Sequence, residues 1–319
     1  MTGLRSGPVP DADAPMVRPS TPAADREIGV RHPVLSHGFV ALVDYMGDDA
    51  AIVQAARVSY GRGTKTVRDD RGLVRYLMRH RHTTPFEMVE LKFLVRLPIF
   101  VARQFIRHRT GSFNEASARY SIVPDEYELL PAEAIRRQST RNRQGRGDPL
   151  PPETVARFRD DLDRISRDAY AAYEKALNAG VAREVARLVL PVSYYTQWYW
   201  KTNLWNLFHF LSLRLDLHAQ EEIRVYAAEL ARLGRLVAPI AFEAFEEFEI
   251  RGLVLTQRER TAVRALLDGQ SPESACARAG LALTREDGTP MTTGEGVEFL
   301  EKLARLRADD PSGGAPGAP

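Results

Sequence analysis

The chain is organised around one polar stretch, which reads Arg103-Gln104-Phe105-Ile106-Arg107-His108-Arg109-Thr110-Gly111-Ser112-Phe113-Asn114-Glu115-Ala116-Ser117-Ala118-Arg119-Tyr120. Its arginines carry planar, forked donors, which suit a phosphate or a carbonyl–imide edge better than a lysine does. Its serines, its asparagine and its glutamate add short side chains that can fix the orientation of a ligand. A solvated basic surface typically pairs Lys with Glu at i,i+4 spacing, and this stretch contains no Lys. The residues therefore favour a site for an anion or nucleotide over the alternative, a basic surface loop.

The same stretch carries a specific signature. Residues 107–119 match every fixed position of R-H-R-x-x-S-x-N-E-x-S-x-R, and in this they resemble the flavin-dependent thymidylate synthases. The similarity extends from about Val34 to about Phe248. It implies an α+β fold, with a small antiparallel or mixed sheet flanked by long helices. It also implies a homotetramer whose active sites lie at the subunit interfaces.

The resemblance implies an activity as well: the reductive methylation of dUMP to dTMP. In this family 5,10-methylenetetrahydrofolate donates the carbon, NADPH supplies the reducing equivalents, and FAD carries the hydride. No cysteine acts as a nucleophile. The expected partners are these small molecules and further copies of the chain, with no nucleic acid and no membrane.

The resemblance also assigns roles to individual residues. The expected substrate-binding residues are Gln104, Arg107, Glu115, Ser117, Arg119, Arg187 and Arg214. The expected FAD-binding residues are His82, Thr84, Glu87, Arg107, His108, Arg109, Glu115, Asn203, Leu204, Trp205 and His209. Arg214 is in addition the expected catalytic residue, which promotes ionisation of N3 of uracil. Trp205 stands where some family members carry a basic residue, so its contact with the flavin stays open.

The chemistry of the residues agrees with this on separate grounds. Methylation at C5 of uracil requires more electron density in the ring, and one route adds a cysteine thiolate to it. Cys276 is the only cysteine, and it lies far along the chain from every polar cluster. The other route polarises N3–H and leaves the redox step to a flavin, with guanidinium groups stabilising the charge that develops. An arginine-rich stretch suits this second route.

Composition sets the wider limits. The 44 Lys and Arg minus the 42 Asp and Glu leave a net charge of +2, whereas a protein that coats nucleic acid is far more basic. One cysteine excludes an internal disulfide and a multi-cysteine zinc site, and we expect no metal. No secretory signal is recognisable, and no apolar run approaches the roughly 18–20 residues that span a bilayer. We therefore expect a cytoplasmic protein.

Composition also predicts the domains. The proline-rich residues 1–33 are expected to form a disordered tail, 34–250 the catalytic domain, and 251–319 a helical appendage with a disordered end. Between Ile135 and Pro152 the sequence turns to Arg, Gln, Ser, Asn and Gly. This indicates a mobile solvated loop or, alternatively, a basic flap that holds an anionic substrate.

Periodicity predicts the elements around the signature. Apolar residues alternate from Val89 to Leu97, which is typical of a strand with one buried face. Pro98 is expected to begin a helix that continues towards Gly111 and holds Gln104, Arg107 and His108 on one face. Residues 192–201 predict an aromatic strand, which either belongs to the core or stacks on a cofactor. Asn203 is expected to cap the next helix, and the aromatic face of Phe242, Phe245 and Phe248 to pack between subunits.

Other functions are possible on residue chemistry alone. A nucleotide- or RNA-binding module without catalysis uses the same residue types. A metal-dependent hydrolase built on His80, His82, His108 and His218 is a weaker alternative, because no further ligand stands at suitable spacing. Arg214 itself has a purely structural alternative, which is an ion pair with Asp216 or Asp44.

Overall fold

The computed structural model describes residues 18, 20–58, 70–139 and 145–307. The chain divides into two compact units, of which the first comprises residues 1–136 and 149–245 and the second residues 137–148 and 246–319. Residues 1–17 and 308–319, the outer parts of the predicted tails, lie outside the described residues, as do residues 140–144 of the predicted loop.

The first unit is built on a five-stranded antiparallel sheet with the order β1-β2-β3-β7-β4. The bounds of its strands are β1 His32–Val34, β2 Gly38–Met46, β3 Glu90–Pro98, β4 Ser112–Glu115 and β7 Tyr195–Asn203. The predicted mixture of a small sheet with long helices is confirmed. The strand predicted at 89–97 is β3, and its alternation places Leu91, Phe93 and Val95 in the core.

Aromatic side chains fill the space where β3 and β7 pair. Phe93 lies opposite Trp200 and Val95 opposite Trp198, and all four side chains are buried. Phe105 contacts Trp200 with ring centroids 5.5 Å apart and Phe210 at 4.6 Å. The aromatic strand predicted at 192–201 therefore belongs mainly to the core.

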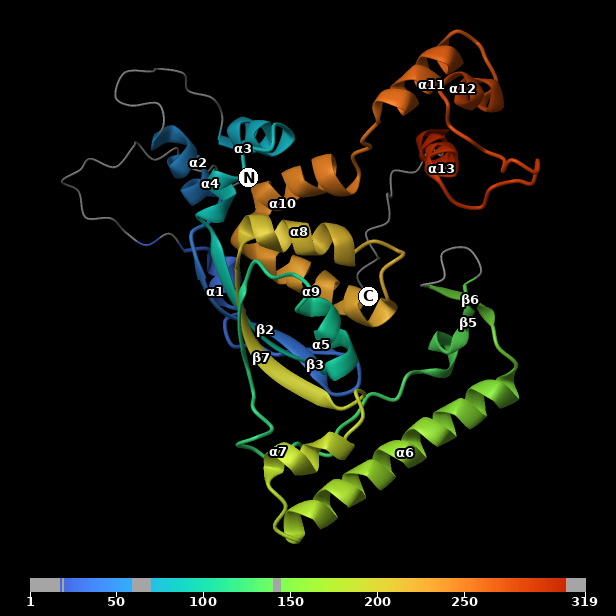
Figure 1. Ribbon diagram of the computed structural model, residues 1–319. Helices are drawn as coiled ribbons and strands as arrows, with labels where there is room; N and C mark the ends of the chain where they lie inside the picture. Colours follow the sequence, from blue (N-terminus) through green and yellow to red (C-terminus); the bar gives the residue numbers. More distant parts are fainter. Residues whose placement is uncertain (1–17, 19, 59–69, 140–144, 308–319) are drawn as a thin grey trace, which may run out of the picture. The chain divides into compact units, whose positions relative to one another are not determined.

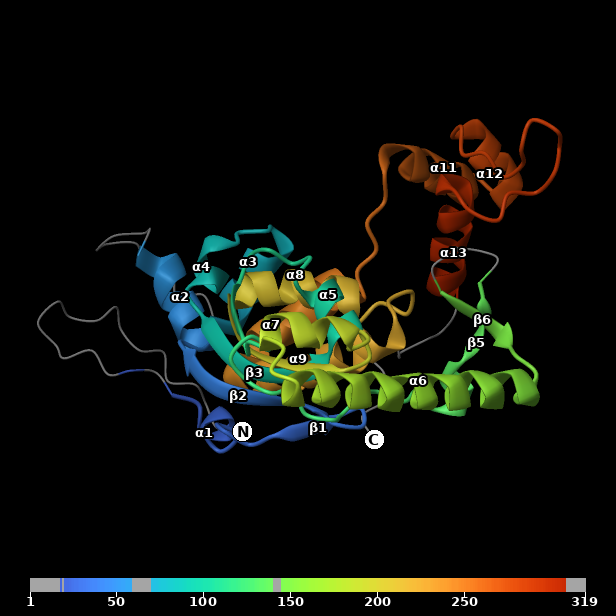
Figure 2. The same cartoon turned by 60° about the horizontal axis from the view of Figure 1, so that its bottom comes forward.

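Helices pack on this sheet and at one end of it (Figure 1). Those that contact the strands are α5 Ile99–Phe105, α8 Leu204–Arg214 and α9 Glu221–Val237. A second group comprises α2 Asp49–Val58, α3 Asp70–Arg79, α4 Thr84–Glu87 and α10 Pro239–Phe245. The long helix α6 Pro152–Asn178 packs against 3₁₀ turn η1 Ala132–Ala134, α7 Arg183–Ala186 and 3₁₀ turn η2 Arg187–Val189, as Figure 2 shows from a second side. None of the described helices combines the length and apolar character needed to cross a membrane.

The structure corrects the predicted N-terminal tail for residues 20–33. These residues form α1 Pro22–Asp25 and the beginning of β1. Ala24 is fully buried, and Tyr45 donates a hydrogen bond of 2.5 Å to Asp25. The composition suggested disorder because the segment offers few apolar residues, but contacts with β2 and α9 from far along the chain hold it in place.

The structure also corrects the prediction that Phe242 and Phe245 pack between subunits. Both side chains are buried within the chain, where Phe208 stacks on Phe245 at 4.3 Å and lies edge-on to Phe242 at 5.0 Å. The stripe is amphipathic, as predicted, but its partners lie in the same chain: α10 packs against α3 and α9, and Phe208 of α8 contacts both rings.

The second unit has a core of its own. It contains the π-helical turn η3 Glu246–Ile250 and the helices α11 Gln257–Leu267, α12 Pro272–Arg278 and α13 Glu295–Arg307. Its buried side chains are Ala262, Ala265, Ala275, Cys276, Leu281 and Phe299. The predicted capping box of Thr256 and Glu259 is present. The predicted loop 135–152 contributes the two-stranded sheet of β5 Arg136–Gln138 and β6 Arg146–Pro149, so its described parts are not a structureless loop.

We predict that Phe105→Ala lowers the free energy of unfolding by about 3–5 kcal/mol, because it removes a large ring that contacts β7 and α8. Urea unfolding followed by tryptophan fluorescence measures the change. Met46→Ala, in an apolar side chain of β2 that is 56% exposed, is the control and should change stability by less than about 0.5 kcal/mol. Equal effects of the two substitutions would contradict the central place of Phe105 in the core.

Candidate functional site

The signature begins just after α5. This helix ends earlier than the sequence predicted. The helix stops at Phe105, Ile106 is its C-cap, and the amide of His108 donates to the carbonyl of Phe105 at 2.9 Å. Arg107 and His108 therefore lie on a turn and not on the helical face of Gln104, which corrects the expectation of a helix towards Gly111. The physical reason is long-range, because His108 is held by a residue of α8.

That residue is Arg214, whose Nε donates a hydrogen bond of 3.0 Å to Nε2 of His108. The imidazole of His108 lies 4.9 Å from the Phe210 ring and 5.8 Å from the His209 ring. Residues 106 positions apart are thus brought together within one chain. The ion pairs left open for Arg214 are not formed in the described structure, since Asp44 pairs with Arg18 and Asp216 with His218, each at 2.8 Å.

This cluster is short of negative charge. Burial lowers the pKa of Arg214, and the charge of Arg107 lowers it further. Burial also lowers the pKa of His108 to about 4, and Arg214 and His209 act in the same direction. Among the described residues, no carboxylate offsets these effects on either group. At neutral pH His108 is therefore a neutral acceptor for Arg214, and the cluster presents an uncompensated guanidinium charge that favours an anionic ligand.

Glu115 ends the edge strand β4, and Ser117 follows two residues later. Ser112 lies opposite Lys201 and Glu115 opposite Trp198, so the signature runs along β7. The hydroxyl of Thr196 donates to Oε1 of Glu115 at 2.5 Å. Ser117 accepts a hydrogen bond from the amide of Arg119 at 3.2 Å. No strand was predicted here, because the polar residues of this stretch do not alternate as those of a half-buried strand do.

Arg119 and Arg187 lie near α7. Arg119 pairs with Glu184 of α7, at 3.0 Å from its Nε and 2.9 Å from its Nη2. Arg187 begins η2 and is exposed. Figure 1 shows α7 at one end of the sheet and α8 towards the other. The expected substrate-binding residues are therefore divided between two places in one chain.

The third group of expected residues surrounds the beginning of α8. Asn203 caps this helix as predicted, with its side chain accepting from the amide of Asn206 at 2.9 Å. Trp205 is half-buried and lies 6.0 Å from the ring of Phe86, which is part of α4 together with Thr84 and Glu87. This contact connects the segment 82–87 with α8.

The surfaces available to a ligand differ within this group. His82 and Thr84 are exposed and Glu87 is half-buried. His209, one helical turn from Trp205, and Arg109 are exposed as well. The side chain of Leu204 is fully buried, and its amide donates to the carbonyl of Val89 at 2.8 Å.

Sequence reasoning missed two residues that hold expected site residues. Gln220, at the beginning of α9, accepts a hydrogen bond of 2.5 Å from Gln104. Glu184 holds Arg119. Both contacts join distant parts of the sequence, and no local pattern marks either residue.

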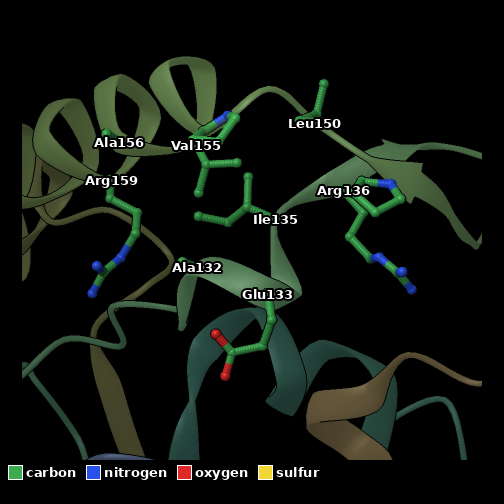
Figure 3. A pocket seen from close by; sticks show the side chains of 10 residues that line it. Ala132, Glu133, Ile135, Arg136, Leu150, Val155, Ala156 and Arg159 are labelled. Atoms are coloured by element: carbon green, nitrogen blue, oxygen red, sulfur yellow. The ribbon is translucent and has the colours of Figure 1, made fainter.

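A cavity of about 430 Å³ lies elsewhere in the first unit, between η1 and the beginning of α6 (Figure 3). Ile135, Leu150 and Val155 make its interior apolar, and Arg136 and Arg159 stand at its edge. Arg159 donates to the carbonyl of Leu130 at 3.0 Å. None of the expected site residues lines this cavity. In the described residues no group of three or more His, Cys, Asp or Glu gathers as a metal site does.

Comparison with known proteins shows similarity over most of the chain. Residues 41–240 match the family model described as thymidylate synthase complementing protein. The flavin-dependent thymidylate synthase of Ruegeria pomeroyi is 52% identical over 262 residues, which are 81% of this chain and 87% of that protein. That of Thermus thermophilus is 54% identical over 254 residues, 79% of this chain and 92% of that protein.

A solved structure is similar as well. The UMP/dUMP methylase PolB from Streptomyces cacaoi, bound with 5-Br dUMP, superposes with a TM-score of 0.61 at 37% identity. The match covers 68% of this chain and 98% of the methylase.

The depressed pKa of His108 predicts a dependence of stability on pH. The unfolded chain takes up a proton on this imidazole below its ordinary pKa of 6.5, whereas the folded chain resists protonation until about pH 4. The contribution of neutral His108 to the free energy of unfolding is therefore complete above pH 6.5 and is lost as the pH falls towards 4. We predict that His108→Gln, which keeps an acceptor for Arg214, narrows the difference between urea midpoints at pH 7 and pH 5. An unchanged difference would contradict the assignment.

Proposed function

The chain belongs to the flavin-dependent thymidylate synthase family, and we propose that the cluster of Arg107, His108 and Arg214 binds and polarises its pyrimidine substrate. The enzyme is a methyltransferase that converts dUMP to dTMP with FAD as cofactor and with 5,10-methylenetetrahydrofolate and NADPH as co-substrates. The bound flavin supplies the hydride chemistry that no side chain can. The observation that carries our proposal is the guanidinium charge of this cluster, which no carboxylate of the described chain offsets.

The residues present fit an anionic dinucleotide. Arg109 and His209 are exposed beside the cluster, and Trp205 adds an aromatic surface next to Phe86 of the segment 82–87, which also carries His82 and Thr84. Guanidinium groups bind pyrophosphate oxygens in pairs, and an indole face stacks on planar rings. We propose that these residues hold the FAD, together with Glu87, Glu115, Asn203 and the backbone of Leu204.

Arg214 is the proposed catalytic residue. Its Nε is occupied by His108, so its Nη groups remain for the carbonyl–imide edge of uracil. Burial and the charge of Arg107 disfavour the cationic form of Arg214. A ligand that becomes negative therefore interacts with this cation especially favourably. Loss of the N3 proton makes the ring such an anion, and Arg214 would lower the pKa of N3 by stabilising it.

His108 serves this role by staying neutral. A protonated imidazole could not accept the hydrogen bond from Arg214 and would repel its charge. The pKa of about 4 keeps Nε2 free of a proton at neutral pH, with the ring proton on Nδ1. His108 thus orients the guanidinium group of Arg214 towards the substrate.

A cysteine nucleophile has no place in this proposal. Cys276 is fully buried in the core of the second unit, and burial raises the pKa of its thiol. A buried, protonated thiol is a poor nucleophile. The activation of the ring therefore falls to the arginines. The single buried cysteine also fits a cytoplasmic location, which we include in the proposal.

We also propose that active sites form between subunits of a homotetramer. Arg187 follows α7 directly and Arg214 ends α8, and Figure 1 shows these two helices towards different ends of the sheet. Large apolar side chains are exposed beside Arg187, including Val185, Leu188 and Val192, of which Leu188 is 77% exposed. Such a concentration of apolar surface is typical of a subunit contact, and a second copy that covers it would bring its own arginines to the site.

We predict that Arg214→Ala abolishes dTMP formation while the protein keeps its flavin. The expected loss is at least about 10²-fold in kcat, the scale seen when one charge-stabilising group is removed from an active site. Product is measured by tritium release from labelled dUMP, and flavin by its visible absorbance, which should still bleach on addition of NADPH. Turnover at the wild-type rate would remove Arg214 from the mechanism.

Cys276→Ala is the matched control. It removes the thiol and leaves the arginine cluster intact, so turnover should stay within about twofold of wild type, since the cluster alone activates the ring. A variant that folds and binds flavin but does not turn over would bring back the thiolate route.

We predict that Leu188→Glu lowers the oligomeric state, because it places a charge in the proposed subunit contact. Light scattering coupled to size-exclusion chromatography measures the mass. Leu306→Glu, at a position of the second unit that is 61% exposed, should leave the mass unchanged. If Leu188→Glu also leaves the mass of the wild-type assembly unaltered, this face is not the contact.

A further inference from the structure

We infer that Glu184 is a positioning residue for the nucleotide site, which it serves through Arg119. The inference rests on the proposed role of Arg119 in substrate binding and extends it to a residue outside the signature. Glu184 lies 65 positions from Arg119, on the short helix α7.

The contact engages one edge of the guanidinium group. Oε2 of Glu184 accepts from Nε of Arg119 at 3.0 Å and lies 2.9 Å from its Nη2. Arginine carries five N–H donors in a fixed plane, so this arrangement leaves Nη1 and the outer N–H of Nη2 unused by Glu184. Those donors form the fork that binds a phosphate or carboxylate. The carboxylate of Glu184 thus fixes the plane of the guanidinium group and leaves its outer edge free.

The backbone on both sides of this contact is anchored. Arg183, the neighbour of Glu184, donates to the carbonyl of Tyr120 at 2.7 Å. Further along, the hydroxyl of Tyr173 accepts from the amide of Val123 at 3.2 Å, and Tyr170 donates to the carbonyl of Val123 at 3.1 Å. Since Tyr173 is fully buried, α6 holds this segment firmly. Glu184 therefore orients a side chain whose backbone already has a fixed place.

The exposure of the ion pair between Arg119 and Glu184 argues for a role in binding rather than in stability. The side chains of Arg119 and Glu184 are 54% and 52% exposed, and ion pairs in such positions add little to stability. A surface arginine free of its partner samples many rotamers, and a ligand must then order it on binding. Glu184 removes that cost in advance, although its charge alone disfavours an anion. The geometry points to orientation as the larger effect, because the contact is side-on and leaves the fork open.

The test is dUMP binding to the flavin-loaded enzyme, measured by titration calorimetry, with KM and kcat measured in parallel. We expect Glu184→Ala to raise the Kd and KM for dUMP about fivefold to tenfold and to leave kcat within about twofold, since ordering one long side chain carries a cost of this order. Glu184→Gln keeps an oxygen acceptor for Arg119 and should stay within about twofold of wild type. Glu174→Ala, which removes an exposed carboxylate from the neighbouring α6, is the control and should change neither constant.

A double-mutant cycle distinguishes the positioning role of Glu184 from the proposed role of Arg119 in substrate binding. Arg119→Ala should weaken dUMP binding, and Glu184→Ala should then have no further effect. If Arg119→Ala weakens binding but Glu184→Ala does not, or tightens it, the positioning role is wrong and the substrate role of Arg119 stands. Equal losses for Glu184→Ala and Glu184→Gln would also overturn it. An unchanged Kd in Arg119→Ala would overturn both.

Discussion

The pairing of β3 with β7 is the constraint from which the site follows. Both strands direct large apolar side chains to one face, and Phe105 inserts its ring against Trp200 of β7 and Phe210 of α8. The helix α5 follows β3 directly and ends at Phe105, whose side chain is buried in this core. Arg107 and His108, which follow the C-cap Ile106, are thereby placed next to α8. The hydrophobic core thus determines the position of charged groups that no apolar contact could hold.

The charges at this position are maintained against their own repulsion. Burial and Arg107 lower the pKa of Arg214, whereas burial, Arg214 and His209 lower the pKa of His108 and keep it neutral. The folded chain bears this cost because the core around Phe105 is large, and an anion would relieve it. A site assembled in this way discriminates by charge before it discriminates by shape. It suits the proposed reaction, in which the substrate ring becomes an anion and the arginines, without a thiol, activate it.

Local patterns predicted what local forces determine. The alternation from Val89 to Leu97, the cap at Asn203 and the capping box at Thr256 follow from the nearest residues along the chain, and the structure has all three. The end of α5 could not be predicted in this way, since it depends on a contact between residues 106 positions apart. The burial of Phe242 by Phe208 and the ordering of α1 have the same origin in distant contacts. The arginine signature was recognisable from the sequence, but Glu184, which pairs with Arg119, and Gln220, which bonds Gln104, were not.

The position of β4 connects the fold with binding. It forms the edge of the sheet, pairs only with β7 in the described structure, and exposes Ser112, Asn114 and Glu115. Three of the four side chains of β4 are polar, so burial of apolar surface stabilises this strand little. Much of its stabilisation must come from the ring of Phe113, which stacks on Trp200 with centroids 5.9 Å apart. A short, polar edge strand also resists pairing with a stray chain. The features that make the signature a good ligand surface are therefore the same ones that keep an open sheet edge from aggregating, and one aromatic contact supports both.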